Sequence, residues 1–271
     1  MIYKSFLPSP ALAGFVRNYT IIHFHFNQKT PPPKERAAKP EEKIVFYIKG
    51  SVSRYNPANG TTQVPPPVSI YSNQSGKSTF QTTPEFHALI IFLKPGMLHR
   101  LIGLPMLEMQ QEILDAELFF GTEVRTISER LAEADDYISM ISIIEQFLST
   151  RFGQLEKNSI DVVADRLLTD PTSYTIDDIA NQACLSTRQF RRKFTGQIGI
   201  SPKFFSRLAR FNHSYRYKIS NPGTSWSSIA QQFMYTDYHH LEKEFREFSG
   251  LSPQQWLTTH MTAPERLLKL R

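Results

Sequence analysis

The pattern of hydrophobic and polar positions divides the chain into a β-rich first part and a helical remainder. The first 105 residues hold 13 of the 18 prolines, which mark loops because proline cannot donate to a sheet ladder. Between them lie short runs rich in Ile, Val, Phe and Tyr, with the length and composition of strands. These runs are residues 19–26, 44–49, 68–72 and 86–93. They predict an antiparallel sheet folded into a small sandwich or half-barrel.

After Gly121 the apolar residues recur at spacings of three and four, the periodicity of a helix with one buried face. Asp135 and Asp136 interrupt this seam and predict two helices. The seam either packs on the chain's own sheet or pairs with a second subunit, because a narrow seam also suits a coiled-coil-like contact. The dimer alternative assigns dimerisation to Ile127, Leu131, Ile138, Ile141 and Leu148. The polar stretch 150–159 is the best linker candidate.

The last hundred residues contain an internal repeat. Residues 175–182 match residues 225–232 at an offset of 50, and farther along the offset becomes 51. At the second offset Phe194 matches Phe245, Gly199 matches Gly250, Ser201-Pro202 matches Ser252-Pro253, and Phe205 matches Trp256. A match of residue type and spacing over about 30 residues indicates one supersecondary unit used twice.

Each copy of the repeat is predicted to form two helices joined by a tight turn. Thr175 and Ser225 are suitable N-caps for the first helices, and Ser186 and Asp237 for the second helices. Two helices joined in this way form a helix-turn-helix, whose second helix enters the DNA major groove. Residues 202–220 predict a long helix between the copies, which at about 1.5 Å per residue spans roughly 27 Å.

Composition narrows the class of protein. Hydrophobic residues make up 40% of the chain and charged residues 21%, which excludes a disordered chain. The longest apolar runs, about six residues, are too short to span a bilayer, and the first residues lack the pattern of a secretion signal. The one cysteine, Cys184, excludes an intrachain disulfide and a cysteine metal cluster. We therefore expect a cytoplasmic protein without a membrane partner, in which Cys184 packs as a small hydrophobe.

Positive charge is concentrated in the repeat. The formal net charge is +6, of which residues 1–158 contribute +1 and residues 159–271 contribute +5. From Ile179 to Thr236 there are nine Lys and Arg residues and no acidic residue. A charge run alone is more simply explained as a solvated basic surface. Here the positive stretch coincides with the repeated helix-turn-helix pattern, which favours a polyanion as the partner.

Helical geometry separates the inward face of each second helix from its outward face. Phe190 and Phe194 form the inward pair of the first copy, and Leu241 and Phe245 that of the second. The outward faces predict DNA contacts by Thr187, Arg188, Gln189, Arg191, Arg192 and Thr195 in the first copy, and by Tyr238, His239, His240, Lys243 and Arg246 in the second. Arginine can bind guanine O6 and N7 with two hydrogen bonds. The second face also carries Glu242, Glu244 and Glu247, so we expect it to attract DNA less strongly.

Residues 176–256 resemble the DNA-binding domain of AraC/XylS-type transcription regulators. The matching positions of the second copy are Tyr235, Asp237, His240-Leu241, Phe245, Gly250, Ser252-Pro253 and Trp256. The resemblance places Arg188, Gln189, Arg192 and Thr195 on the first base-reading helix, and Tyr238, His239, His240 and Lys243 on the second. Cys184 and Met234 replace the family's usual turn glycines, and a residue with a Cβ is strained there if the backbone needs positive φ.

The resemblance also implies functions for the remaining parts of the chain. The run from Phe92 to Gly96, followed by residues 102–105, is similar to the cupin-like sensor and dimerisation modules of such regulators, many of which bind a small molecule. It implies double-stranded DNA as partner, RNA polymerase if the protein is an activator, a small-molecule effector in the amino-terminal part and a homodimer. We expect the helix starts at Thr175 and Ser225 to meet phosphates. No cofactor is expected.

Two other functions are open. His23 and His25 point to the same side of a strand, and with His87 and His99 they suggest a metal-dependent cupin-type enzyme. Phe24, with Ile22 and Phe26, forms the better core face, which turns both histidines outward. A protein-interaction module that has lost DNA binding is the second alternative, because three glutamates occupy the second recognition helix. We assign no catalytic residue and no metal ligand.

The predicted architecture is therefore an α+β chain with a mainly antiparallel amino-terminal part, a helical region and an all-α carboxy-terminal part. We predict a β-rich sensor at 1–120, a helical dimerisation region at 121–152 and a DNA-binding domain at 159–260. Within that domain we place one helix-turn-helix at 175–197, the linking helix at 202–220 and the other helix-turn-helix at 225–249. The predicted function is that of a sequence-specific transcription regulator, and we expect it to be an activator.

Overall fold

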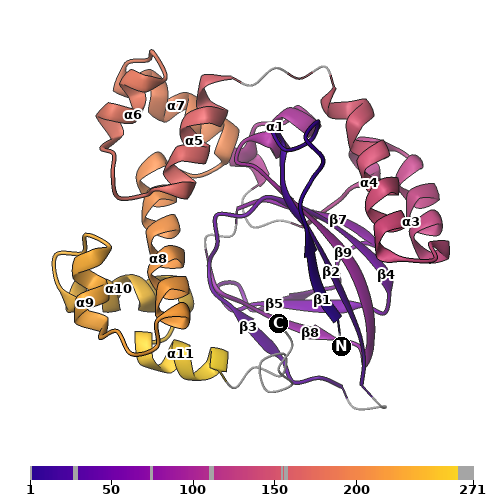
Figure 1. Ribbon diagram of the computed structural model, residues 1–271, viewed down its shortest axis with the longest axis horizontal. Coiled ribbons are helices and arrows are strands. Elements are labelled where there is room, and N and C mark those ends of the chain that lie inside the picture. The colour runs from indigo at the N-terminus through magenta and orange to yellow at the C-terminus, as the bar shows by residue number, and fades with distance from the viewer. Residues whose placement is uncertain are drawn as a thin grey trace.

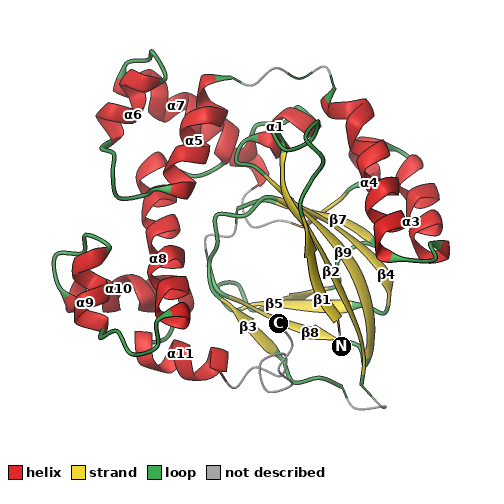
Figure 2. Ribbon diagram, in the orientation of Figure 1, coloured by secondary structure: helices red, strands yellow, loops and turns green. Residues whose placement is uncertain are grey.

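The computed structural model divides the chain into a β-rich half, a helical hairpin on its outer side and a separate group of helices (Figures 1 and 2). It describes residues 2–26, 30–73, 76–109, 113–153, 155 and 158–261. The predicted linker at 150–159 therefore lies partly outside the described residues. The expected α+β class is confirmed.

Two antiparallel sheets build the amino-terminal half. The larger sheet has the order β1 (Ile2–Phe6), β2 (Val16–His25), β9 (Glu85–Leu93), β4 (Lys43–Lys49), β7 (Val68–Tyr71) and β10 (Ile113–Asp115). The smaller sheet has the order β3 (Lys34–Arg36), β8 (Ser78–Thr82), β5 (Val52–Asn56) and β6 (Thr61–Gln63). The four predicted strands correspond to β2, β4, β7 and β9, which lie next to one another as β2-β9-β4-β7 in the larger sheet.

The central strands of the larger sheet are apolar on both faces because each face is covered. One face, with Phe24 and Phe86, packs toward the smaller sheet in a core that includes Phe80. The other face, with Tyr19 and Ile21, packs under the helical hairpin. The prediction that Phe24 belongs to a core and that the neighbouring histidines point away from it is therefore confirmed.

The helical region covers the outer face of the larger sheet (Figure 1). Its elements are α1 (Met97–Ile102), the short helix η1 (Met106–Met109), α2 (Glu117–Phe120), α3 (Glu123–Glu133) and α4 (Tyr137–Phe152). Asp136 caps α4 by accepting a hydrogen bond from the Ser139 amide, which confirms the predicted break between two helices. Ile127, Leu131, Ile141 and Leu148 are buried in the core below, whereas Ile138 is 61% exposed. Of the two alternatives for this seam, packing on the chain's own sheet is the one that the structure displays.

The carboxy-terminal helices contain the repeat as two helix-turn-helix units. The first unit is α6 (Ile176–Gln182) with α7 (Thr187–Ile198), and the second is α9 (Trp226–Gln232) with α10 (Tyr238–Ser249). The long helix α8 (Pro202–Ser220) stands between them (Figure 1). Two further helices, α5 (Ser159–Thr169) before the repeat and α11 (Pro253–Met261) after it, complete this part.

A strap between the two sheets, residues 37–42, lies against the carboxy-terminal helices. Ala37 and Ala38 are buried in the same apolar cluster as the two helix-turn-helix units. The Ala38 amide donates to the Phe248 carbonyl of α10 (2.9 Å), and the Ala38 carbonyl accepts from the Asn212 side chain of α8 (3.3 Å). Asn73, after β7, donates to the Ile198 carbonyl at the end of α7 (2.9 Å). The β-rich half therefore contacts both units.

Candidate nucleic-acid interface

The first helix-turn-helix unit is fixed by two reciprocal N-caps. The Thr175 hydroxyl accepts from the Asp178 amide, and the Asp178 carboxylate accepts from the Thr175 amide (2.9 Å). Ser186 and Gln189 exchange hydrogen bonds in the same way at the start of α7. The predicted caps are thus present, and each satisfies amides that a helix start otherwise leaves without a partner.

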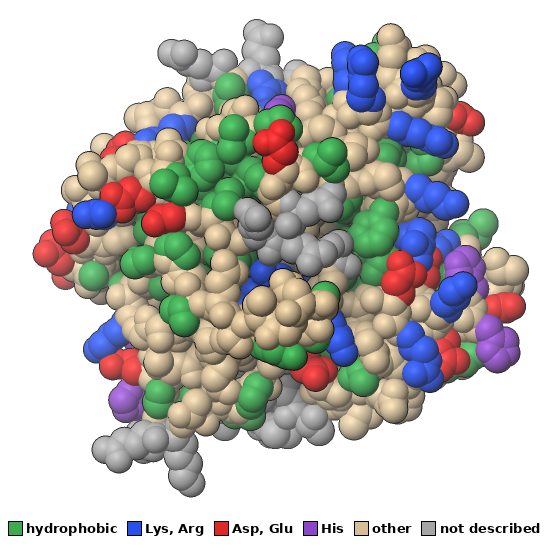
Figure 3. All heavy atoms as spheres, turned by 180° about the vertical axis from the view of Figure 1, so that it is seen from behind, with side chains coloured by type: hydrophobic (Ala, Val, Ile, Leu, Met, Phe, Trp, Pro, Cys, Tyr) green, Lys and Arg blue, Asp and Glu red, His purple; other side chains and the backbone are tan. Residues whose placement is uncertain are grey.

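Helix α7 separates its apolar face sharply from its basic face. Phe190, Phe194 and Ile198 are fully buried. The four cations of the helix are exposed and form no ion pair with a described residue: Arg188, Arg191, Arg192 and Lys193. Figure 3 shows Lys and Arg side chains gathered over this end of the molecule. Such an unpaired group of guanidinium ions is suited to phosphate and guanine.

The other predicted contacts of α7 have partners within the chain. The Thr187 hydroxyl donates to Asp177 (2.7 Å), the Gln189 side chain serves the cap of its own helix, and Thr195 is half-buried. The arginines are therefore the side chains that α7 leaves free to reach an external partner.

The second unit repeats this geometry with a different outward face. Leu241, Phe245 and Phe248 are fully buried, and Asp237 caps α10 by accepting from the His240 amide (2.7 Å). Of the predicted contacts, His239, Lys243 and Arg246 are exposed, whereas Tyr238 and His240 are half-buried. Arg246 is paired with Glu242 one turn earlier (2.8 Å). This unit presents fewer unpaired cations than α7 does.

One of the three glutamates of α10, Glu244, does not belong to its outward face, which corrects part of the expectation of a mixed face. Glu244 is 1% exposed, and its carboxylate accepts from Arg207 (2.9 Å) and Arg210 (2.7 Å) of α8. Glu247 binds Arg207 as well. At about 100° per residue Glu244 falls within roughly 40° of the inward Phe248, so the same helical geometry that placed the phenylalanines also predicts this position. The negative charge is turned toward α8.

The two helix starts, both predicted to meet phosphates, differ in charge. The first turn of α6 contains Asp177 and Asp178, and hydrogen bonds from Thr175 lower the pKa of Asp178. The first turn of α9 contains no acidic residue, and Ser225 there binds Ser228. Because an anion favours a helix start that carries no competing carboxylate, the two predicted contacts are not equivalent.

Both turns contain a left-handed residue with a side chain. The backbone φ is 54° at Cys184 and 56° at Met234, the positions predicted to be strained. The expectation that Cys184 packs as a small hydrophobe is wrong, since it is exposed. The left-handed conformation ends α6 and turns the Cys184 side chain outward, and Met234 is likewise 69% exposed. The condition for strain at these two positions, a positive φ, is therefore met.

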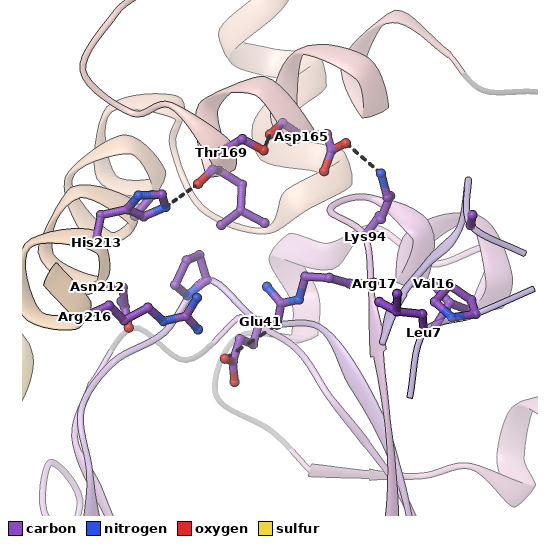
Figure 4. Close-up of a pocket in the computed structure, with 15 residues that line it drawn as sticks. Leu7, Val16, Arg17, Glu41, Lys94, Asp165, Thr169, Asn212, His213 and Arg216 are labelled. Carbon is purple, nitrogen blue, oxygen red and sulfur yellow. Dashed lines mark hydrogen bonds and ion pairs between the residues drawn. The ribbon is translucent and has the colours of Figure 1, made fainter. Parts of the chain in front are cut away.

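A cavity of about 500 Å³ lies between the β-rich half and helices α5 and α8 (Figure 4). Its wall contains Arg17 and Glu41 from the β-rich half and His213 and Arg216 from α8. Burial opposes ionisation of Glu41, but the cations Lys39, Lys43 and Arg17 lower its pKa to about 2. Across the cavity Lys94 pairs with Asp165 of α5 (2.8 Å). Sequence patterns did not indicate this cavity, because its residues meet only when the two parts of the chain pack together.

The histidines of the enzyme alternative do not form a metal centre in the part of the chain that the structure describes. The rings of His23 and His87 are stacked with centroids 4.3 Å apart, and His23 Nδ1 lies 3.1 Å from the Tyr137 hydroxyl. His25 is exposed, and His99 binds the Leu104 carbonyl. Among the described residues no three His, Cys, Asp or Glu side chains are grouped to hold an ion. Likewise, no described helix is long and apolar enough to cross a membrane.

Comparison with known proteins assigns the carboxy-terminal part to a class. Residues 179–259 match a family model described as a helix-turn-helix domain. The chain therefore carries the helix-turn-helix domain that the repeat predicted, over the residues that resemble the DNA-binding domain of AraC-type regulators. A helix-turn-helix domain supports a DNA-binding regulator over the metal-dependent enzyme alternative. No curated protein matches the chain in sequence.

Several solved structures resemble the whole chain at low sequence identity. An apo ToxT variant from Vibrio cholerae is 12% identical with a TM-score of 0.49, covering 89% of this chain and 97% of that chain. Wild-type ToxT from Vibrio cholerae with a bound unsaturated fatty acid is 12% identical with a TM-score of 0.49. The match covers 89% of this chain and 95% of that chain. The AraC-like transcriptional activator CuxR is 11% identical with a TM-score of 0.27. The match covers 98% of this chain and 88% of that chain.

Proposed function

We propose that the protein is a site-specific transcription regulator that reads duplex DNA with α7 and α10. The observation that supports this proposal most directly is the exposed, unpaired set of cations on α7, opposite a fully buried Phe190 and Phe194. Arg188 and Arg192 are proposed to reach base edges, with His239 and Lys243 contributing from α10. Ser225 is proposed to meet a phosphate, and Thr175 contributes less because Asp178 occupies its amide.

Selection of binding sites from a random duplex pool tests this proposal. We expect enrichment of a two-part sequence with its halves about one DNA turn apart, as two helix-turn-helix units on one side of the duplex require. The affinity for the selected duplex, measured at two salt concentrations, should fall as salt rises because Lys and Arg displace phosphate counterions. Equal affinity for selected and scrambled duplexes would show that the protein binds DNA without reading it, and no binding at all would favour the protein-interaction module.

We further propose that a small anionic effector binds the cavity between the two halves. Arg17 and Arg216 face this space from opposite halves, so one carboxylate or phosphate ligand between them would contact both. Such a ligand acts on DNA binding only if it binds one arrangement of the halves more tightly than the other. The test is the shift in melting temperature with a panel of small carboxylates and phosphates, with Arg216→Gln as the variant that should lose the shift.

Activation through RNA polymerase and formation of a homodimer are also proposed. The hairpin of α3 and α4 is the dimer surface that the apolar seam suggested. Because the structure buries Ile127, Leu131, Ile141 and Leu148 within the chain, the side chain available for this contact is Ile138. Sedimentation of the wild-type chain and of Ile138→Asp tests the dimer, and transcription in vitro from a promoter that carries the selected site tests activation.

A further inference from the structure

A buried carboxylate joins the second recognition helix to the long helix α8. Glu244 is 1% exposed, and its Oε1 accepts from Arg207 Nε at 2.9 Å and from Arg210 Nη2 at 2.7 Å. His240 Nε2 lies 3.7 Å from the same oxygen. A buried charge is retained only where its partners keep their geometry, because losing one partner leaves an uncompensated ion. The contact therefore defines where α10 lies on α8.

The two guanidinium groups also hold the segments on either side of Glu244. Arg210 donates to the Met234 carbonyl (3.3 Å) and lies over the Tyr235 ring at 4.1 Å, so it binds the turn before α10. Arg207 lies over Phe248 at 5.3 Å. Together they contact the turn and the second half of the recognition helix, at Glu244, Glu247 and Phe248. The planar fork of arginine makes such contacts directional, which a point charge would not.

Other side chains on the same stretch of α8 contact the first unit and α5. The Phe205 and Phe194 rings meet edge to face at 5.5 Å, and the Ser206 hydroxyl donates to the Pro171 carbonyl at 2.9 Å. His213 Nε2 lies 2.9 Å from the Leu168 carbonyl of α5. The 19 residues of α8 span roughly 28 Å as one uninterrupted helix. The relative position of α7 and α10 thus depends on how each of them is fixed to α8.

The helix-turn-helix fold itself does not require this carboxylate. At the offset of 51, the residue of the first unit that corresponds to Glu244 is Lys193, which is exposed. The two units nevertheless fold alike, with a side-chain cap and a buried pair of apolar residues at corresponding positions. Glu244 therefore serves something that only the second unit needs, namely a polar attachment to α8.

We propose that Glu244, with Arg207 and Arg210, is a positioning cluster that fixes the distance and rotation of α10 relative to α7. It thereby determines which spacing between the two halves of a DNA site the protein accepts. Glu244 contacts no base in this proposal and acts through the helix that carries Lys243 and His239. The inference rests on the proposed function, because it presupposes that both helices read one duplex.

The experiment measures affinity for the selected duplex and for duplexes with one base pair added or removed between the halves. One base pair shifts the second half by about 3.4 Å and rotates it by roughly 35°. We expect the wild-type chain to bind both altered duplexes at least about tenfold more weakly, since simultaneous contact by two linked units is lost when the geometry forbids it. In Glu244→Gln the selected duplex should bind about tenfold more weakly, and the difference between duplexes should shrink to about twofold.

Glu242→Gln is the matched control. It removes the same negative charge from the same helix, but Glu242 pairs with Arg246 of its own helix and does not contact α8. This variant should keep the wild-type preference for spacing, whereas a purely electrostatic role of Glu244 would give both variants the same gain in affinity on every duplex. Arg210→Lys is the second variant, because it keeps the positive charge while losing the directed contacts to Glu244 and Met234.

The outcomes separate this inference from the function on which it rests. If the wild-type chain shows no preference for a two-part duplex, the proposed function fails. If the wild-type chain discriminates between spacings and Glu244→Gln does so equally, the positioning role is overturned. If Glu244→Gln loses its helical circular dichroism, the Arg210→Lys variant is used to test the positioning role instead. Unchanged discrimination between spacings in Arg210→Lys overturns that role as well.

Discussion

The two helix-turn-helix units share one design but distribute charge in opposite ways. In the first unit the recognition helix carries four exposed cations and the preceding helix starts with two aspartates. In the second unit the helix start carries no acid, while the recognition helix has its cations partly paired and a buried glutamate on its inner side. The comparison teaches that duplication preserved the caps and the core and left the charges free to diverge. In the proposed function the first unit contributes more to base reading, and the buried glutamate of the second unit fixes its position on α8.

The shared core gives the largest predicted effects and should be equal in the two units. Phe194→Ala and Phe245→Ala each remove a ring that is fully buried among other aromatic rings. Each variant should lose about 3–5 kcal/mol of unfolding free energy, because the cavity that remains cannot close. Urea unfolding of the full chain measures this loss, with the half-buried Phe204→Ala as a milder control. A loss below about 2 kcal/mol in one unit alone would show that the two cores are not equivalent.

The contact between the β-rich half and the first unit includes a titratable group, Glu42, which accepts from Asn73. Burial raises the pKa of Glu42 to about 7, against hydrogen bonds from the Leu98 and Gly96 amides and Asn73 that lower it. Asn73 in turn holds the end of α7, whereas the strap holds α10 through the backbone of Ala38. Since the folded pKa exceeds the unfolded value near 4.5, the contribution of Glu42 to stability is complete below pH 4.5 and is lost as the pH rises through about 7.

Glu42→Gln should therefore stabilise the chain at pH 8, by up to about 3 kcal/mol, and change little at pH 4.5. Glu35→Gln, on β3, is the control for a carboxylate without this environment. Denaturant midpoints at the two pH values measure the difference. An equal shift of the midpoint at both values would contradict the assignment.

Base reading should depend more on the first recognition helix than on the second. Arg192→Ala should cost about 1–3 kcal/mol on the selected duplex if Arg192 binds a guanine, and the loss should be small on scrambled DNA. Lys243→Ala should cost less than about 1 kcal/mol, because a lysine acts as a point charge. Fluorescence anisotropy with both duplexes measures the two losses. Equal weakening on every sequence would refute base reading by Arg192.

Exchanging the helix starts should exchange their affinity for phosphate. Asp178→Ser removes a carboxylate from the start of α6, and Ser228→Asp introduces one at the corresponding position of α9. Binding to scrambled duplex should strengthen in the first variant and weaken in the second, each by about 0.3–1 kcal/mol at low salt. Both differences should shrink as salt is added. Two changes of the same sign would show that these helix starts do not face DNA.

The smallest expected effect lies in the turns, where the two units are alike. Cys184→Gly and Met234→Gly remove a Cβ from a left-handed backbone and should each stabilise the chain by about 0.5 kcal/mol, after the entropic cost of glycine. Cys184→Ala, which keeps the Cβ, should give no such gain. Thermal melting measures the difference. A loss of stability in both glycine variants would indicate that the side chains make contacts worth more than the strain.

The sequence predicted the parts of this molecule that depend on local pattern. The repeat predicted the caps Thr175, Ser186, Ser225 and Asp237, because a hydroxyl or carboxylate at a helix start acts within one turn. Four apolar strands were also predictable. Short and exposed strands such as β1 and β6 were not, because their pairing partners rather than their own residues make them strands. Helix α5 was missed although Asn158 and Asp161 form a capping box.

Contacts between distant segments were beyond the reach of local pattern. The cavity combines residues near position 17 with residues near position 213, and no periodicity connects them. Glu244 was assigned to the outward face because it was read as a charge, although its angle to Phe248 and the presence of Arg207 and Arg210 three residues apart on α8 were signals of its burial. The DNA contacts themselves stay predictions.

The strap at residues 37–42 has a consequence for the boundaries of the molecule. Ala38 fills part of the apolar cluster below α10, although it is more than a hundred residues away from the repeat in the chain. A fragment that begins at α5 would leave that surface uncovered and the Phe248 carbonyl without the Ala38 amide. The helices proposed to bind DNA are thus only part of the structure that supports them. A fragment made of the repeat alone would lack the strap that packs against α10.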